Sequence, residues 1–160
     1  MLDEAAVVIL VLVAAEDIRT MKISDKYNIA LLALAAVSAG SCAAGGTAVA
    51  HEIAWRACGA FSVSLLMYLL NRVACCRGRS RAFGGGDIFL CFSAGALVGP
   101  SAMLKAAMIA MIAAGVFAAG GLLSGRMKRD SRFPLGPFLC GGIIFMMLAK
   151  AADQCALSAL

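Results

Sequence analysis

The sequence predicts an all-α, polytopic membrane protein with about six transmembrane helices. Of its 160 residues, 62% are hydrophobic and 14% are charged, and the mean hydropathy is +0.93. This composition is too apolar for a soluble domain of this size. The apolar residues fall into six runs, and the basic residues gather in alternate loops between them. We therefore expect one membrane-embedded domain over residues 1–160, with no separate soluble domain.

Each expected helix follows from an apolar run of sufficient length, because roughly 20 apolar residues cross the hydrocarbon core. The first run follows two acidic residues and lacks a signal-peptidase cleavage pattern, which indicates a retained helix. Gly99-Pro100-Ser101 predicts a tight break between the fourth and fifth helices. The six expected spans are approximately 4–20, 27–44, 52–71, 85–100, 102–124 and 135–152.

The basic residues predict the orientation of these helices. Eleven of the fourteen Lys and Arg residues follow the first, third and fifth spans. The positive-inside rule places these three loops in the cytoplasm and both termini outside it. The basic loops carry no interleaved aromatic residues, so nucleic acid is not an expected partner. The eleven residues are Arg19, Lys22, Lys26, Arg72, Arg77, Arg79, Arg81, Arg126, Lys128, Arg129 and Arg132.

Two aspartates, Asp17 and Asp87, lie where the first and fourth apolar runs meet the cytoplasmic side. These runs are uncharged only over Ala5–Ala15 and Ile88–Pro100, which is too short to cross a bilayer at about 1.5 Å per residue. Each helix must therefore draw its polar end into the cytoplasmic interface. An ionisable group at membrane depth is costly unless it is paired or hydrated. We expect both aspartates at a similar depth, as a catalytic pair.

Three consecutive glycines, Gly84, Gly85 and Gly86, directly precede Asp87. Glycine permits close backbone approach and destabilises a helix. The triplet therefore predicts that Asp87 closely approaches a neighbouring helix.

The seven cysteines show no CxxC pair and are odd in number. They predict neither a zinc site nor a disulfide framework. We expect no metal and no cofactor.

Three segments together resemble the prepilin peptidases, membrane aspartyl proteases that process type IV pilins and related pseudopilins. Asp17–Asp25 is similar to the D-x-R-x-x-x-I-P-N motif of that family. Gly84–Asp87 resembles its G-x-G-D motif, and Phe133–Leu139 is similar to the P-x-G-P-F-L stretch that opens the last helix. All three occur in the order and spacing of the family across six spans.

The chain departs from the usual residues of the family at three positions. Ser24 and Asp25 stand where proline and asparagine are usual, and Phe89 stands where many members have lysine. Both aspartates are intact. The departures therefore concern substrate details more than chemistry.

The resemblance implies a membrane aspartyl endopeptidase of the bacterial cytoplasmic membrane with its active site facing the cytoplasm. Its substrate would be a prepilin or pseudopilin, cut between a short basic leader and a hydrophobic helix. The early position of Asp17 makes the chain similar to the small, peptidase-only members that serve Flp and tight-adherence pili. We therefore expect no methyltransferase activity and no S-adenosylmethionine site. The oligomeric state stays open.

Aspartyl proteolysis needs one carboxylate to deprotonate water and one carboxylic acid to polarise the scissile carbonyl. Two close carboxylates share one proton and titrate as a coupled pair. We assign Asp17 and Asp87 to these roles without deciding which is the base. Gly84–Gly86 would offer backbone groups to an extended leader. Arg19 is a candidate contact near the pair, and Asp25 could contact the basic leader or cap the following helix.

Two other functions use the same residues. A small transporter or channel could bind protons or cations at Asp17 and Asp87, although transporters usually place such groups near the midplane, between repeats. A presenilin-like protease shares G-x-G-D, but it usually has tyrosine before its first aspartate, where this chain has Glu16. A purely structural membrane subunit would leave the paired motifs unexplained.

Overall fold

The computed structural model describes residues 2–44, 49–77, 83–125 and 134–158, and the regular structure in these ranges is entirely helical. The predicted all-α class is therefore confirmed. The six helices are α1 (Leu2–Thr20), α2 (Asp25–Ala44), α3 (Val49–Cys76), α4 (Gly85–Val98), α5 (Pro100–Leu123) and α6 (Gly136–Ser158).

Each helix coincides with one predicted span, and the largest differences lie at helix ends. α3 continues to Cys76, beyond the predicted end at residue 71, because residues 72–76 include no proline or glycine that would stop it. α6 likewise continues to Ser158. The predicted basic residues Arg79 and Arg81, and those within 126–132, lie outside the described residues.

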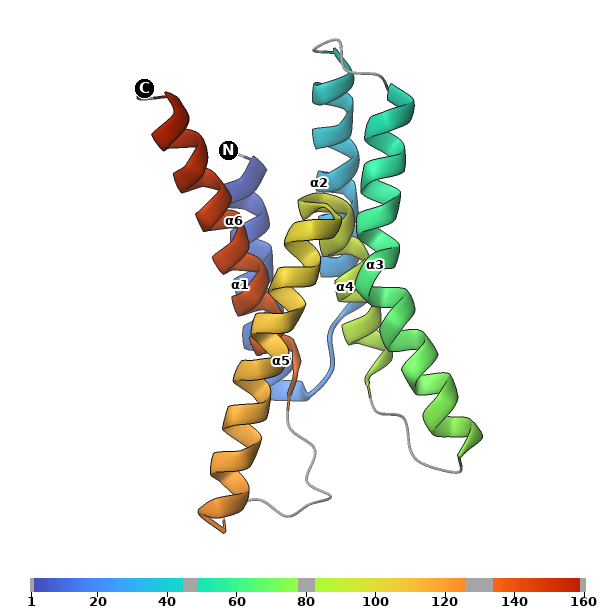
Figure 1. Cartoon of the computed structure of the whole chain (residues 1–160), viewed down its shortest axis with the longest axis vertical. Helices are drawn as coiled ribbons and strands as arrows, with labels where there is room; N and C mark the ends of the chain where they lie inside the picture. The colour runs from blue at the N-terminus through green and yellow to red at the C-terminus, as the bar shows by residue number, and fades with distance from the viewer. Residues whose placement is uncertain (1, 45–48, 78–82, 126–133, 159–160) are drawn as a thin grey trace.

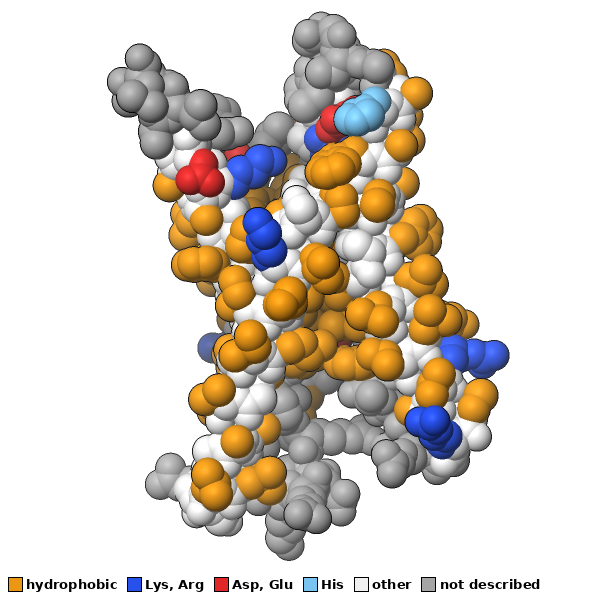
Figure 2. Space-filling model, viewed as in Figure 1, with side chains coloured by type: hydrophobic (Ala, Val, Ile, Leu, Met, Phe, Trp, Pro, Cys, Tyr) orange, Lys and Arg blue, Asp and Glu red, His pale blue; other side chains and the backbone are white. Residues whose placement is uncertain are grey.

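Three of the described helices, α3, α5 and α6, are long and apolar enough to cross a bilayer. α4 is apolar but has only 14 residues. Hydrophobic side chains cover most of the face shown in Figure 2, with few charged side chains among them. A soluble protein would bury such a surface, so the surface is that of a helical membrane protein.

α4 is the central element of the bundle (Figure 1). It packs against α2, α3, α5 and α6, while α1 packs against α2 and α6. α1 begins and α6 ends at the same end of the bundle, and α4 begins toward the opposite end. The largest side chains of the core interlock these helices; they include Leu10, Leu31, Met67, Leu90, Met103, Leu139 and Ile143.

α3 and α4 approach each other closely through glycine. A Cβ at Gly59 would collide with the carbonyl oxygen of Gly95, and a Cβ at Gly95 would collide with that of Gly59. At the end of α4, Gly99 has a φ of 86° and lies against Trp55 of α3. This left-handed conformation favours glycine and forms the predicted break before α5. The contacts fix α4 on α3.

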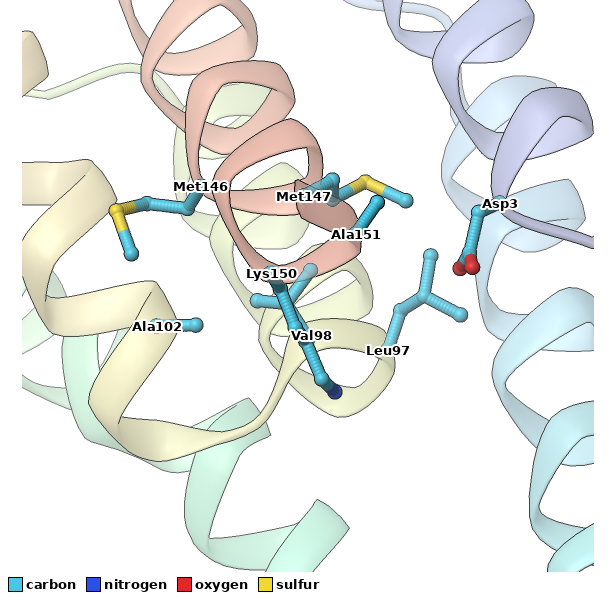
Figure 3. A pocket seen from close by; sticks show the side chains of 8 residues that line it. All are labelled: Asp3, Leu97, Val98, Ala102, Met146, Met147, Lys150 and Ala151. Atoms are coloured by element: carbon cyan, nitrogen blue, oxygen red, sulfur yellow. The ribbon is translucent and has the colours of Figure 1, made fainter. Parts of the chain in front are cut away.

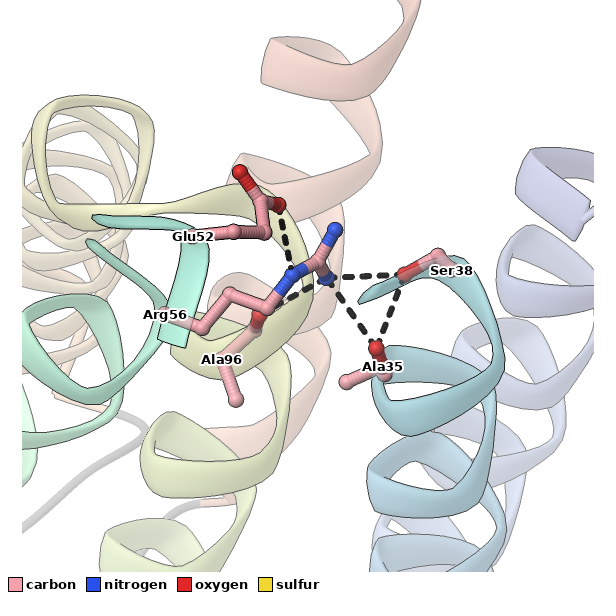
Figure 4. A network of polar contacts seen from close by, with 5 residues as sticks. All are labelled: Ala35, Ser38, Glu52, Arg56 and Ala96. Atoms are coloured by element: carbon pink, nitrogen blue, oxygen red, sulfur yellow. Dashed lines mark hydrogen bonds and ion pairs between the residues drawn. The ribbon is translucent and has the colours of Figure 1, made fainter. Parts of the chain in front are cut away.

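Arg56 of α3 joins three helices near the end of α4 that is distant from Asp87 (Figure 4). Its guanidinium donates to Glu52 Oε1 at 2.8 Å, to Ser38 Oγ at 2.7 Å, and to the carbonyl oxygens of Ala35 at 3.1 Å and Ala96 at 3.3 Å. The last carbonyls of a helix have no partner within the helix. Arg56 therefore satisfies one such group of α4 and ties it to α2.

Candidate active site

Asp17 lies near the end of α1 and is only 5% exposed. Its Oδ2 accepts a hydrogen bond from the backbone N–H of Gly136, the first residue of α6, at 3.0 Å. The first N–H groups of a helix lack partners within it and attract negative charge. A Cβ at position 136 would lie 2.5 Å from the same oxygen. Glycine at 136 is therefore what lets α6 begin against Asp17.

Asp87 lies in the first turn of α4 and is half-buried. Its Oδ2 accepts a hydrogen bond from the backbone N–H of Gly84 at 3.3 Å. Gly84 precedes the helix in an extended conformation, with φ −67° and ψ 150°. Each aspartate thus accepts an N–H from a glycine at the start of a helix. In both places the carboxylate compensates the positive end of that helix.

One pocket of about 280 Å³ contains both aspartates. α1, the segment after it and the start of α4 supply its walls. The structure therefore brings together the two aspartates that the sequence singled out. The residues lining the pocket are Asp17, Met21, Lys22, Ile23, Gly84, Gly85, Gly86 and Asp87.

The three glycines of the pocket differ in their surroundings. A Cβ at Gly86 would lie 3.0 Å from Cβ of Ile23, so a larger residue here would push against Ile23 at the start of α4. A Cβ at Gly84 would lie 3.1 Å from Asp87 Oδ2. A Cβ at Gly85 meets nothing within 4 Å. The sequence predicted that the triplet brings Asp87 close to a neighbouring helix; the close contact with another part of the chain is instead that of Gly86 with Ile23, in the segment between α1 and α2, while the neighbour of Gly84 is Asp87 itself.

The remaining candidate residues lie at the edge of the site. Arg19 and Asp25 are exposed, and neither is among the lining residues. Asp25 is the first residue of α2, where its charge complements the helix N-terminus. Glu16 is half-buried, and its Oε2 is buried without a hydrogen-bond partner among the described residues.

Gly136 and Met21 were not among the residues that the sequence singled out for the site. The P-x-G-P-F-L resemblance marked the segment of Gly136 but gave no role to its backbone N–H. Met21 has a φ of 50°, and its N–H donates to the carbonyl oxygen of Asp17 at 2.9 Å. This left-handed residue ends α1 one turn after the aspartate. The sequence did not indicate this helix end, because position 21 holds methionine rather than the glycine or asparagine that usually adopts this conformation.

A second pocket, of about 90 Å³, lies between α1, α6 and the junction of α4 with α5 (Figure 3). Its charged residues are Asp3 and Lys150, and Leu97, Val98 and Met147 are among its other walls. It offers one carboxylate and one amine. A general acid and base made from two carboxylates is therefore possible in the larger pocket and not in this one.

Comparison with known protein families identifies the family of the chain. The sequence model of the type IV leader peptidase family matches residues 5–119, which is more than half of the chain and includes both aspartates and the three glycines. No curated protein and no solved structure matches the chain. Family and fold together make it a helical membrane protein with a protease activity. The chain belongs to the type IV leader peptidase family.

Proposed function

We propose that the protein removes the short basic leader from type IV prepilins or pseudopilins, with Asp17 and Asp87 as its catalytic pair. The observation that carries this proposal is the shared pocket, which unites carboxylates from α1 and α4 that are far apart in the sequence. Membership of a leader peptidase family favours hydrolysis over the transport of protons or cations. Flp-type and tight-adherence pilins are the substrates that we propose.

The chemistry requires one ionised and one protonated carboxyl group. The ionised group removes a proton from water, whose oxygen attacks the scissile carbonyl carbon, while the acid donates its proton to the carbonyl oxygen. The tetrahedral intermediate then collapses and the C–N bond breaks. The carboxyl group that took a proton from water gives it to the leaving nitrogen, and the other carboxylate takes a proton from a hydroxyl of the intermediate. The N–H groups of Gly136 and Gly84 contact Oδ2 of the two aspartates. In the proposed mechanism the other oxygen of each carboxyl group contacts water and substrate.

The glycine triplet is proposed to receive the extended segment that is cut. Nothing packs where a Cβ of Gly85 would lie, so packing within the chain does not require glycine there. Gly85 also lines the pocket that holds both aspartates, so we propose that the peptide backbone of the substrate passes beside it. We assign the exposed carboxylate of Asp25 to contacts with the basic leader, and Arg19 to the neighbourhood of the aspartate pair.

The proposed membrane arrangement has six crossings, with both termini outside the cytoplasm and the aspartate pair at the cytoplasmic interface of the bacterial inner membrane. Its support is that α1 begins and α6 ends at one end of the bundle (Figure 1). Arg19, Lys22 and Lys26 follow Asp17 at the other end of α1. We assign residues 1–160 to one membrane-embedded peptidase domain.

Co-expression with candidate prepilins tests this function. Asp17→Asn and Asp87→Asn keep the size of each side chain and remove the acid–base group, so each should abolish leader removal on a gel-shift assay. Asp3→Asn is the matched control, because Asp3 lines the pocket at the other end of α1. The proposal is wrong if either site variant accumulates in the membrane and still processes prepilin at the wild-type rate.

A further inference from the structure

Asn71, near the end of α3, pairs with the backbone of Phe83. Its Nδ2 donates to the carbonyl oxygen of Phe83 at 2.8 Å, and its Oδ1 accepts from the N–H of Phe83 at 2.8 Å. Asn71 is buried, with 9% of its surface exposed. Nothing in the sequence indicated this pairing, since a single polar residue close to the cytoplasmic end of a span is unremarkable.

The pairing fixes one residue of the backbone from both sides. A planar side-chain amide that binds the N–H and C=O of one residue restricts both its position and its rotation. The Phe83 side chain packs against the core as well. Without Asn71, both backbone groups would lose their partners in a partly buried place, where unpaired polar groups are costly. Phe83 is therefore anchored by its backbone and its side chain.

The next residue transmits this anchoring to the site. Gly84 follows Phe83 directly, and its N–H donates to Asp87 Oδ2 at 3.3 Å. The carbonyl oxygen of Gly84 also accepts the N–H of Ile88 at 3.3 Å, which begins α4. The peptide plane between Phe83 and Gly84 carries both the carbonyl that Asn71 binds and the N–H that Asp87 accepts. The orientation of that plane decides where the donor points.

We infer that Asn71 is a positioning residue for Asp87, acting through Phe83 and Gly84. The inference rests on the proposed catalytic role of Asp87. The rest of α4 is held on α3 without Asn71, through the Gly59–Gly95 contact and through Arg56. Loss of the Asn71 amide should therefore disturb the start of α4 more than the fold.

Kinetics of the full-length protein with a prepilin substrate test the inference. Asn71→Leu should lower kcat by up to roughly 100-fold, because a misplacement of about 1 Å can cost about that much, and leave KM nearly unchanged. Ser64→Ala is the matched control, because Ser64 is also buried on α3 but bonds only to Ala60 of its own helix among the described residues. It should keep the wild-type kcat. A wild-type kcat in Asn71→Leu would overturn the inference.

A double-mutant cycle separates positioning from general loosening of the fold. Gly84→Pro removes the N–H that Asp87 accepts, and the φ of −67° at this position suits proline. Gly84→Ala adds a Cβ but keeps the N–H. The ratio of the kcat of Gly84→Pro to that of Gly84→Ala therefore isolates the effect of the hydrogen bond. If Asn71 acts through this N–H, Asn71→Leu should add little to the loss in Gly84→Pro. If the losses of kcat in Asn71→Leu and Gly84→Pro add up in the double variant, the inference is wrong.

Amide hydrogen exchange provides a readout that does not depend on cleavage. In Asn71→Leu the amides of Phe83 and Gly84 should exchange faster than in the wild type, while Ser64→Ala should leave them unchanged. If these two amides exchange at the wild-type rate in Asn71→Leu, the positioning role of Asn71 is wrong, and this result does not depend on which substrate the enzyme cleaves. If the wild type cleaves no prepilin, the proposed function fails, and exchange alone then decides whether Asn71 holds this segment.

Discussion

The backbone N–H of Gly136 donates to Oδ2 of Asp17 at 3.0 Å, which joins the start of the last helix to the end of the first. The family match ends at residue 119, before this glycine. The orientation of one proposed catalytic carboxylate therefore depends on a segment outside the matched region. α6 is part of the site as well as part of the bundle.

Substitution of Gly136 by alanine should abolish or strongly reduce leader cleavage. The added Cβ would lie 2.5 Å from Asp17 Oδ2, so either the carboxylate or the start of α6 must move. Gly141→Ala, in the same helix, is the control, because its Cβ meets nothing within 4 Å. Cleavage rates of the two purified variants give the comparison. Equal rates would show that the Gly136 contact does not matter to the reaction.

Gly85→Ala and Gly86→Ala should have different effects although the residues are adjacent. The Cβ at position 86 meets Ile23 at 3.0 Å, so Gly86→Ala should lower the free energy of unfolding by about 1–3 kcal/mol, as overpacking does. Gly85→Ala has room and should keep the wild-type stability, but should raise KM by narrowing the path of the substrate. Thermal unfolding in detergent and KM for prepilin test the pair. A wild-type KM in Gly85→Ala would remove Gly85 from the proposed substrate path.

Gly95→Ala should destabilise the protein as a whole. Its Cβ would collide with the backbone of Gly59, and a backbone cannot move aside as a flexible side chain can. We expect a loss of about 1–3 kcal/mol or more in the free energy of unfolding. Gly115→Ala on α5 is the control, since its Cβ meets nothing within 4 Å. Similar melting temperatures for both variants would contradict the close α3–α4 packing.

Arg56→Met should lower stability and leave the chemistry of the folded fraction intact. Methionine keeps most of the apolar volume but donates no hydrogen bond, so the carbonyl groups of Ala35 and Ala96 and the carboxylate of Glu52 lose a donor. The carbonyl of Ala35 keeps the Ser38 hydroxyl as a donor, whereas leaving the carbonyl of Ala96 without Arg56 costs about 1–3 kcal/mol. Thermal unfolding measures the loss, and kcat per folded molecule should be unchanged. A large fall in that kcat would mean that Arg56 acts on the site.

The sequence predicted the helices of the described residues well, because helix formation depends on local apolar runs, and both aspartates line one pocket as their expected closeness requires. Apolar runs of membrane length define helices. Because successive helices cross in opposite directions, the end of the first helix, with Asp17, and the start of the fourth, with Asp87, are expected on the same side of the membrane. The end of α3 was less predictable. A helix can continue past the apolar run until a residue such as glycine or proline stops it, so Cys76 ends α3 beyond the predicted boundary.

The partners within the site could not be predicted, because they depend on which helices are neighbours. Gly136 and Asp17 meet only because α6 packs against α1, and Asn71 meets Phe83 only because α3 packs against α4. One sequence shows that glycines permit close approach but does not name the partner. The buried oxygen of Glu16 is a similar case, since its burial depends on the surrounding helices.

The central claim is that Asp17 and Asp87 act as one catalytic pair, and leader cleavage by purified Asp17→Asn, Asp87→Asn and the double variant tests it most directly. Groups that act as a unit are strongly non-additive, so each single variant should fall to the residual rate of the double variant. A single variant that folds as the wild type does and cleaves prepilin near the wild-type rate would contradict the claim.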